Sequence, residues 1–318
     1  METMMMWLIA ALTTANAADM VNADTEDGFE FTVALGAEFG GQTISACTGS
    51  LITPEVVLTA AHCGAELPME LVVSLGKAFF GPRVDAAESV GFAEGIFHPD
   101  YEELQNGIGG TLGRNDIALL VLEEPVDWVE PVWIAEDSIA DVAVGATVTS
   151  IGFGVTGSNG AGAGIKRSAE LTVDQVDDTF IYSYSSTNED AANICSGDSG
   201  GPQVYWDGER WVQWAVHSWG DQSCLAQSGS TRVDTIAPWV LDQLEDVYGT
   251  RDRCEMWGLY NDGICDVDCP EADADCAVAS DVDGEDAKKS GLGCMAARGA
   301  TSIWWASIVA LVGRRRRS

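Results

Sequence analysis

The feature that most limits how this chain can fold is a serine among glycines at residues 195–202, which read Cys-Ser-Gly-Asp-Ser-Gly-Gly-Pro. Glycines this dense favour a tight turn that side chains would crowd, so that the Ser199 hydroxyl and nearby backbone N–H groups can face one carbonyl. A serine hydroxyl is a weak nucleophile until a base takes its proton. Ser199 is therefore a candidate nucleophile, and the hypothesis requires a histidine and a buried acid elsewhere in the chain.

Two other segments supply these partners. His62 lies at the end of an apolar, strand-like run at residues 56–63 that closes on a cysteine, and Asp116 opens a second apolar run. In the order His, Asp, Ser, the three segments resemble the motifs of the chymotrypsin/trypsin family of serine endopeptidases. The resemblance covers about residues 20–248.

The resemblance implies a role for each of these residues. His62 would deprotonate Ser199 as general base and later protonate the leaving amine, while Asp116 would orient the ring and stabilise its charged form. The backbone N–H groups of Gly197 and Ser199 would form the oxyanion hole. Protein or peptide substrates would be hydrolysed through an acyl-enzyme, with no cofactor or metal required. The alternative is a catalytically inactive protease fold that serves binding or adhesion at the cell surface.

The hydrophobic pattern predicts an all-β protein. Strand-like runs lie at residues 29–35, 71–75, 89–97, 116–122, 146–153 and 169–173. An Asp-Gly pair at 207–208 between aromatic-rich runs predicts a hairpin. Many short strands with almost no helix fit barrels or a sandwich.

The resemblance narrows this choice to two six-stranded antiparallel barrels, at about residues 20–135 and 136–236, with the site between them. A helix is predicted at 238–248, where the apolar residues share one face and Gly249 follows as a stop. The protease-like domain is thus expected over residues 18–249.

Nine cysteines are present, and the pairing of eight of them would suit an oxidising compartment and leave one over. The family resemblance implies two of the disulfides, Cys47 with Cys63 and Cys195 with Cys224. These bonds would clamp the loops that carry His62 and Ser199.

The resemblance also locates the pocket for the side chain that precedes the scissile bond. Asn193 is neutral and occupies the position of the aspartate that trypsin-like members carry, so cleavage after arginine or lysine is not expected. Gly220 and Gly229 match wall positions where small residues leave room for a large side chain. Ser218, Trp219 and Gly220 would offer a backbone edge to an extended substrate. We expect cleavage after apolar or aromatic residues, with a preference for small residues as the alternative.

The N-terminus predicts export. An apolar run at residues 4–12 precedes Ala-Asn-Ala at 15–17, which indicates a signal peptide over 1–17, although Glu2 replaces the usual basic residue before the run. A buried core helix is the alternative interpretation of this run.

Activation of a zymogen is implied by the family resemblance. In the family, the ammonium of a newly formed N-terminus pairs with the carboxylate equivalent to Asp198. We expect a further cleavage before Met20 or Val21, although Asp19 is not the usual basic residue at that place.

An acidic, cysteine-rich module is expected at residues 250–276. It has four cysteines among carboxylates, and two disulfides of open connectivity would replace a core that so small a segment cannot bury. The acidic residues offer oxygen ligands to calcium, in an arrangement that loosely resembles calcium-binding Notch-type repeats. A metal-free acidic module is the alternative.

The C-terminal part contains an expected disordered linker at 277–293 and a tail at 294–318. Cys294, an apolar run at 300–312 and four arginines at 314–317 resemble the tripartite sorting signals of exported myxobacterial proteins. That resemblance implies processing near Cys294 and release or display at a bacterial cell surface. A membrane anchor is the competing interpretation, although the run reaches only about 20 Å as a helix against about 30 Å of hydrocarbon. Before processing, this segment would contact the membrane.

The charge of the chain argues against one class of partner. With 16 Lys and Arg against 50 Asp and Glu, the formal net charge is −34, which is unsuited to nucleic-acid binding and favours a solvated exterior. The two other histidines, His98 and His217, have no acid partner in the sequence pattern. Both are interpreted as structural.

Overall fold

The computed structural model describes residues 23–65, 67–105, 111–156, 161–184, 192–221, 224, 226–267 and 269–278. The chain divides into two compact units, Met1–Leu259 and Tyr260–Ser318. The first unit reaches beyond the expected end at residue 249 because the helix α4 (Arg253–Trp257) packs into its core. Met256 is buried in that core, and the indole N–H of Trp257 donates to the carbonyl oxygen of Ile52 at 3.1 Å.

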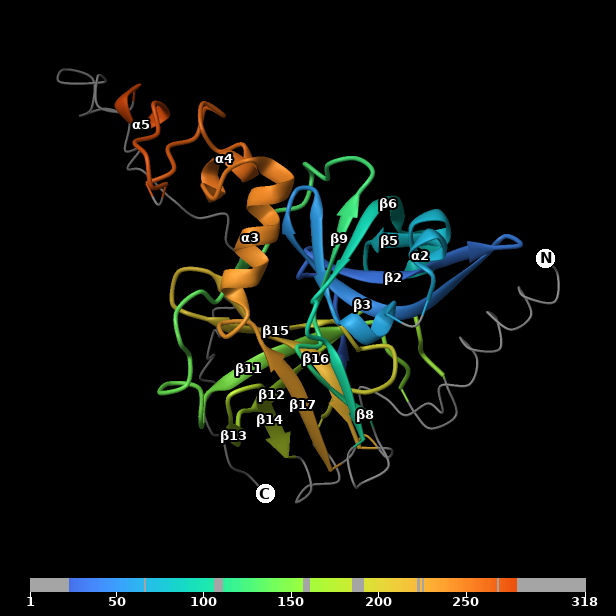
Figure 1. Ribbon diagram of the computed structural model, residues 1–318. Helices are drawn as coiled ribbons and strands as arrows, with labels where there is room; N and C mark the ends of the chain where they lie inside the picture. Colours follow the sequence, from blue (N-terminus) through green and yellow to red (C-terminus); the bar gives the residue numbers. More distant parts are fainter. Residues whose placement is uncertain are drawn as a thin grey trace, which may run out of the picture. The chain divides into compact units, whose positions relative to one another are not determined.

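Six antiparallel strands of the first unit close into a barrel (Figure 1). In order around the barrel they are β2 (Thr32–Phe39), β3 (Gln42–Thr53), β4 (Val56–Thr59), β9 (Ala118–Leu122), β6 (Glu88–Phe97) and β5 (Gly76–Phe80). Fully buried aliphatic residues such as Val33, Leu51, Leu58 and Leu119 fill its centre. The first predicted barrel is therefore confirmed.

The second half of the unit is a nine-stranded sheet. Its path is β1 (Asp24–Thr25), β12 (Arg167–Thr172), β11 (Thr147–Gly152), β15 (Pro202–Trp206), β16 (Trp211–Gly220), β17 (Gln227–Arg232), β14 (Phe180–Tyr184) and β13 (Gln175–Val176), with β10 (Trp133–Ile134) parallel to β16. Within the ranges given above, this path is open, so a closed second barrel stays a prediction. The hairpin predicted at 207–208 is confirmed, because β15 and β16 meet there.

Shorter elements lie in the connections between strands of the barrel. A separate hairpin joins β7 (Glu102–Gln105) to β8 (Thr111–Arg114), and single turns of 3₁₀ helix form η1 (Ala61–Cys63) and η2 (Val84–Ala86). The predicted C-terminal helix is confirmed as α3 (Ala237–Tyr248). It ends at Gly249, whose φ of +73° suits glycine at a helix terminus.

The strand predicted at residues 71–75 is wrong. These residues belong to α2 (Met69–Leu75), and the strand β5 begins only at Gly76. Leu71, Val72 and Leu75 have the spacing of one helical face, and an apolar run this short does not by itself separate a strand from a helix. No residue of α2 is buried, and Leu75 is 45% exposed.

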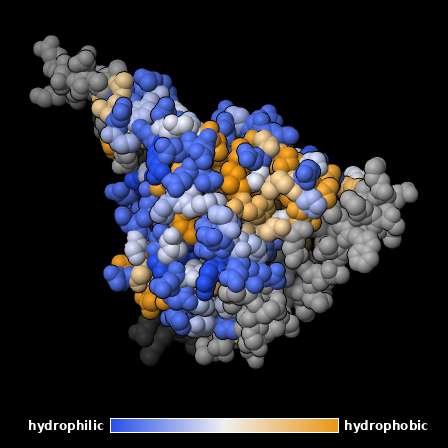
Figure 2. Space-filling view, viewed as in Figure 1, coloured by the Kyte–Doolittle hydropathy of each residue, from blue (hydrophilic) through white to orange (hydrophobic). Residues whose placement is uncertain are grey.

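The surface seen in Figure 2 is mostly hydrophilic, as the charge predicts. Apolar residues gather over the part of this view where Figure 1 shows α2 and β2. Among the described residues, no helix combines the length and the apolar character that a membrane crossing requires.

The second unit contains the disulfide Cys265–Cys276 and the short helix α5 (Asp275–Val278). Its carboxylates accept hydrogen bonds from nearby backbone N–H groups, as Asp273 does from Asp266 and Asp275 at 2.9 and 3.1 Å. Calcium binding by this acidic region stays a prediction.

Candidate active site

His62 and the buried Asp116 form an acid–imidazole pair. His62 lies in η1 directly after β4, and Asp116 lies just before β9, which is the neighbour of β4 in the barrel. The Nδ1 atom of His62 is 2.7 Å from Oδ2 of Asp116, and the backbone N–H of His62 donates to Oδ1 at 2.9 Å. Two bonds to one carboxylate fix both the ring and the backbone that carries it.

The contacts of Asp116 and His62 shift the pKa values of both groups. Asp116 is fully buried, and burial alone would raise its pKa, but the charge and hydrogen bond of His62 and the Ser218 hydroxyl at 2.6 Å outweigh it and lower the pKa. Burial of the ring lowers the pKa of His62, and the Asp116 carboxylate more than offsets this, so that the pKa is raised above 6.5. The His62 side chain remains 33% exposed, which leaves its outer edge open to a substrate.

The serine turn lies against the barrel strands that position His62. The backbone N–H of Thr48 donates to the carbonyl oxygen of Ser199 at 2.8 Å, and Sγ of Cys63 lies 3.6 Å from the same oxygen. Gly200 has a φ of +83°, and a Cβ there would lie 2.1 Å from Oγ1 of Thr59. Glycine thus permits the contact that brings Ser199 beside the segment of His62.

The two backbone N–H groups of the expected oxyanion hole are free of hydrogen bonds to the described residues. In the part of the chain that the structure describes, the backbone N–H groups of Gly197 and Ser199 donate no hydrogen bond, and none joins Ser199 to the ring of His62. Catalytic hydrogen bonds are often long without substrate and tighten in its complex. The two N–H groups are available to an oxyanion.

Asp198 stabilises this turn from inside. It is fully buried, and its carboxylate accepts hydrogen bonds from the backbone N–H groups of Gly154 and Cys195 at 2.8 and 2.9 Å. Its predicted pairing with a new N-terminus lies outside the described residues, as do the signal peptide at 1–17 and the cleavage before Met20 or Val21.

Two disulfides fasten the loops of the site, in the pairing that the family resemblance implies. Cys47 of β3 is bonded to Cys63, and Cys195 of the serine turn is bonded to Cys224.

The residues predicted to form the substrate pocket make contacts within the protein. Asn193 is buried and its Oδ1 accepts the backbone N–H of Ile194 at 2.9 Å, while Ser218 contacts Asp116 as described above. Trp219 lies over Gly229, where a Cβ would be 2.3 Å from the indole nitrogen. Gly229 therefore leaves room for the indole of Trp219, and its predicted place in the wall of the substrate pocket stays a prediction.

Gly220 pairs across the sheet with Ser228, which is buried. The sequence did not predict that Ser228 lies opposite Gly220. The rings of Phe180 and Tyr182, on the strand β14 that lies beyond β17, pack edge-on against Trp219. Sequence spacing alone gave no signal for this register.

The two other histidines lie outside the acid–imidazole pair. Nδ1 of His98 accepts the backbone N–H of Asp100 at 3.2 Å, and its ring contacts that of Trp239. His217 is fully buried with Nδ1 3.1 Å from the Ser230 hydroxyl, and burial lowers its pKa to about 3.

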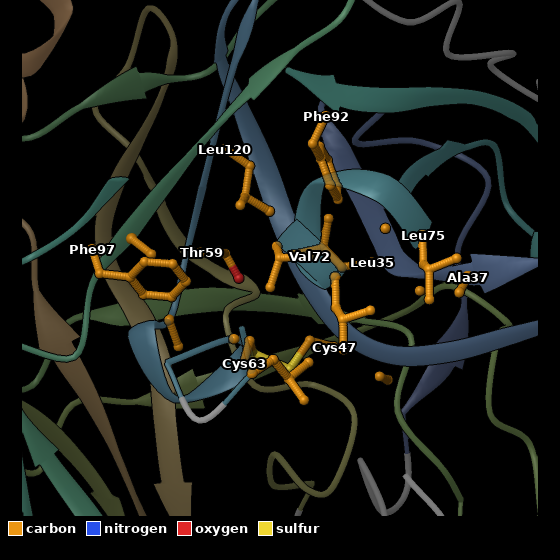
Figure 3. A pocket seen from close by; sticks show the side chains of 18 of the residues that line it. Leu35, Ala37, Cys47, Thr59, Cys63, Val72, Leu75, Phe92, Phe97 and Leu120 are labelled. Carbon is orange, nitrogen blue, oxygen red and sulfur yellow. A yellow bond between two sulfur atoms is a disulfide. The ribbon is translucent and has the colours of Figure 1, made fainter. Parts of the chain in front are cut away.

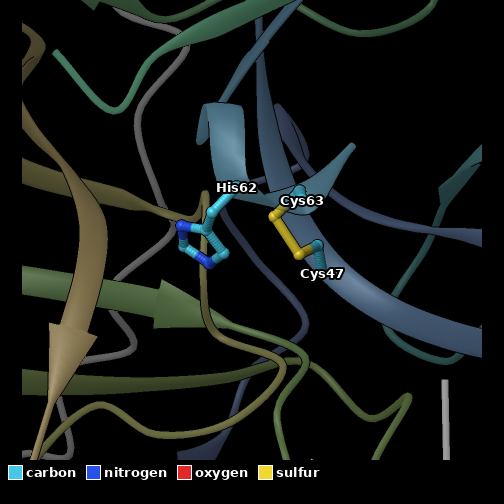
Figure 4. Close-up of side chains that lie close together, drawn as sticks. All are labelled: Cys47, His62 and Cys63. Carbon is cyan, nitrogen blue, oxygen red and sulfur yellow. A yellow bond between two sulfur atoms is a disulfide. The ribbon is translucent and has the colours of Figure 1, made fainter. Parts of the chain in front are cut away.

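Cys47, His62 and Cys63 form the one cluster of potential metal ligands found among the described residues (Figure 4). Both sulfurs belong to a disulfide, and metals are bound by thiolates. This cluster is therefore not suited to a metal.

An apolar cavity of about 120 Å³ is lined in part by these two cysteines (Figure 3). Leu35, Val72, Phe92 and Leu120 point into it from α2 and the barrel strands. Leu71, Val72 and Leu75 of α2 are among the residues that line it. It contains neither His62 nor Ser199.

Several remaining predictions fall on residues outside the described ranges. They are the linker from residue 279 onward, the tail at 294–318 with its apolar run, and the cleavage near Cys294.

Comparison with known proteins identifies the family. The sequence model of the family described as Trypsin matches residues 23–240. Similar proteins are the CLIP domain-containing serine protease B10 of Anopheles gambiae, 30% identical over 63% of this chain and 62% of that protein, and Venom serine protease 34 of Apis mellifera, 29% identical over 63% and 52%. A protein named Trypsin from Saccharopolyspora erythraea is 31% identical over 55% of this chain and 75% of its own length.

The chain thus spans less than two thirds of the length of the first two relatives. The match of the family model covers more than half of the chain, including His62, Asp116 and Ser199. The chain belongs to the trypsin family.

Proposed function

We propose that the protein is a serine endopeptidase in which Ser199 is the nucleophile, His62 the general base and Asp116 the acid that orients it. The observation that carries this proposal is the double hydrogen bond from His62 to the buried Asp116, with the Ser199 turn bonded to the adjoining strand. In this scheme His62 takes the proton of Ser199 as the hydroxyl attacks the peptide carbonyl, and returns it to the leaving amine. Water then hydrolyses the acyl-enzyme by the same route.

The backbone N–H groups of Gly197 and Ser199 would bind the oxyanion of each tetrahedral intermediate. Their lack of partners among the described residues supports this role. Each such donor is worth roughly 2.7 to 4 kcal/mol of transition-state stabilisation.

The protein is proposed to act outside the cell after export. Its disulfides support an oxidising compartment, and the signal peptide pattern supports secretion. The tail that begins near Cys294 would be removed and the enzyme displayed at, or released from, a bacterial cell surface.

We propose cleavage after apolar or aromatic residues. Asn193 is neutral and Gly220 has no side chain, so neither offers a negative charge to a basic side chain, which supports this preference. Peptide substrates that differ only in the residue before the scissile bond test it. We expect the highest kcat/KM for phenylalanine, tyrosine or leucine, and faster turnover of arginine would contradict the proposal.

The activity itself is tested on the same substrates. The exported protein should hydrolyse them, and Ser199→Ala should not. Hydrolysis by Ser199→Ala at the rate of the unaltered protein would refute the proposed nucleophile.

A further inference from the structure

The side chain of Thr48 joins the first barrel to the serine turn and to the loop at Phe153. Thr48 lies on β3, next to Cys47, and is fully buried. Its hydroxyl donates to the carbonyl oxygen of Gly197 at 2.8 Å and accepts the backbone N–H of Phe153 at 3.0 Å. The hydroxyl therefore uses its proton on the serine turn and a lone pair on the loop beside that turn.

The backbone of Thr48 adds two more contacts to the same place. Its N–H donates to the carbonyl oxygen of Ser199 at 2.8 Å, and its own carbonyl oxygen accepts the hydroxyl of Thr59 at 2.8 Å. One residue of the first barrel thus binds the carbonyl oxygens of Gly197 and Ser199, the two residues whose N–H groups are available to an oxyanion.

Gly197 needs such an external contact. Its φ is +91°, and a Cβ there would lie 2.9 Å from Cα of Gly154, so that no side chain can brace it. A hydrogen bond to its carbonyl oxygen restricts rotation of the peptide that follows it. The N–H group of Gly197 lies in the preceding peptide, which is joined to the restrained one at the Cα atom of Gly197, so fixing the second peptide limits how far the first can turn.

The hydrogen bond of the Thr48 hydroxyl with Phe153 also affects the serine turn, because the residues after Phe153 bind that turn. Phe153 precedes Gly154, whose N–H donates to the Asp198 carboxylate at 2.8 Å, and the N–H of Val155 donates to the carbonyl oxygen of Ser196 at 3.1 Å. Through Phe153, Thr48 therefore also holds the segment that binds Asp198 and Ser196.

We propose that Thr48 is a positioning residue for the oxyanion hole: its hydroxyl fixes the Gly197 peptide and the loop at Phe153 in the arrangement that aims the N–H groups of Gly197 and Ser199 at one point. The catalytic part of this inference rests on the proposed function.

The matched variants are Thr48→Val, which keeps the shape and loses the hydroxyl, and Thr48→Ser, which keeps the hydroxyl. Thr53→Val is the control, because Thr53 lies on the same strand, is also buried, and bonds its hydroxyl to Tyr248 at 2.8 Å, away from the serine turn. On peptide substrates we expect Thr48→Val to lower kcat by about 10-fold to 100-fold with KM within about twofold. A peptide boronic acid, which mimics the tetrahedral intermediate, should bind more weakly by a similar factor.

Thr48→Ser and Thr53→Val should both keep kcat within about threefold of the unaltered protein, because only a displaced oxyanion donor has the large cost. An equal fall of kcat in Thr53→Val would show that loss of any buried hydroxyl on β3 has the effect, and would overturn the inference. Thr48→Ala replaces Thr48→Val if the valine variant does not fold.

A second readout separates this inference from the proposed function. Hydrogen–deuterium exchange of the segment 195–202 should be faster in Thr48→Val than in Thr48→Ser or Thr53→Val, whether or not the protein cleaves peptides. If the unaltered protein has no activity, the proposed function fails while exchange still tests the positioning role. Unchanged exchange in Thr48→Val would overturn that role.

Discussion

The buried carboxylate of Asp116 determines what His62 can do. Burial of the imidazole disfavours its charged form, and the adjacent carboxylate favours it by a larger amount, so that the pKa of His62 is raised. A base with a raised pKa takes the Ser199 proton more readily, provided that the pH leaves the ring neutral beforehand.

This balance predicts how activity depends on pH. Activity should fall as the pH drops through the pKa of His62, at a value above the ordinary 6.5, because the protonated ring cannot accept another proton. Asp116→Asn removes the charge that raises this pKa, so the acid limb of kcat/KM should move to lower pH. Steady-state kinetics over the acid and neutral range measure the shift.

In the same variant kcat should fall by about 10⁴-fold, the size known for this change elsewhere in the family. An acid limb that stays in place after Asp116→Asn would mean that a group other than His62 controls it.

At this scale the sequence predicted the residues that carry chemistry better than those that position them. His62, Asp116 and Ser199 lie in recognisable motifs, and the structure brings the first two together. Thr48 has no such signal, because a threonine in a strand is ordinary and its partners lie more than 100 residues away. The contact of Trp219 with Gly229 could not be predicted either, because it depends on the register between two strands.

Among the elements, most strands predicted from apolar runs are present, and one short run, at residues 71–75, is not a strand. Residues 89–97 and 116–122 do form or contain strands, namely β6 and β9. Residues 71–75 became a helix, since their apolar content fits either structure and the contacts of the barrel end decide between them.

A buried lysine joins two elements and predicts how stability depends on pH. Lys166, just before β12, donates from Nζ to the carbonyl oxygens of Gly28 and Phe29, just before β2, at 2.9 and 3.1 Å. Burial lowers its pKa to about 8, although the carboxylates of Glu26 and Glu30 oppose this. Charged Lys166 therefore destabilises the folded chain at neutral pH relative to the unfolded chain.

Between about pH 8 and the ordinary 10.5, the unfolded chain keeps a proton that the folded chain has released, so the free energy of unfolding should rise with pH. We expect the difference in this free energy between the unaltered protein and Lys166→Met to rise by up to about 1.4 kcal/mol per pH unit. Denaturant unfolding at several pH values measures it. A difference independent of pH would contradict the burial of this charge.

At the scale of the whole molecule, the candidate site depends on contact between the two sheets. Asp116 and His62 come from the barrel, while Ser199 and Ser218 come from the second sheet. The hydroxyl of Ser218 reaches Asp116 and that of Thr48 reaches Gly197, so hydrogen bonds cross in both directions. The order of the motifs predicted this meeting only through the family resemblance, because periodicity within a strand contains no information on how two sheets pack.

The central claim is that His62 and Asp116 activate Ser199 in the folded protein, and labelling with a fluorophosphonate tests it most directly. The reagent reacts with an activated serine and leaves ordinary hydroxyls untouched. The exported protein should be labelled on Ser199, His62→Ala should react far more slowly, and Ser199→Ala and the denatured protein should not react. Equal labelling of Ser199→Ala, or no labelling of the folded, exported protein, would contradict the account.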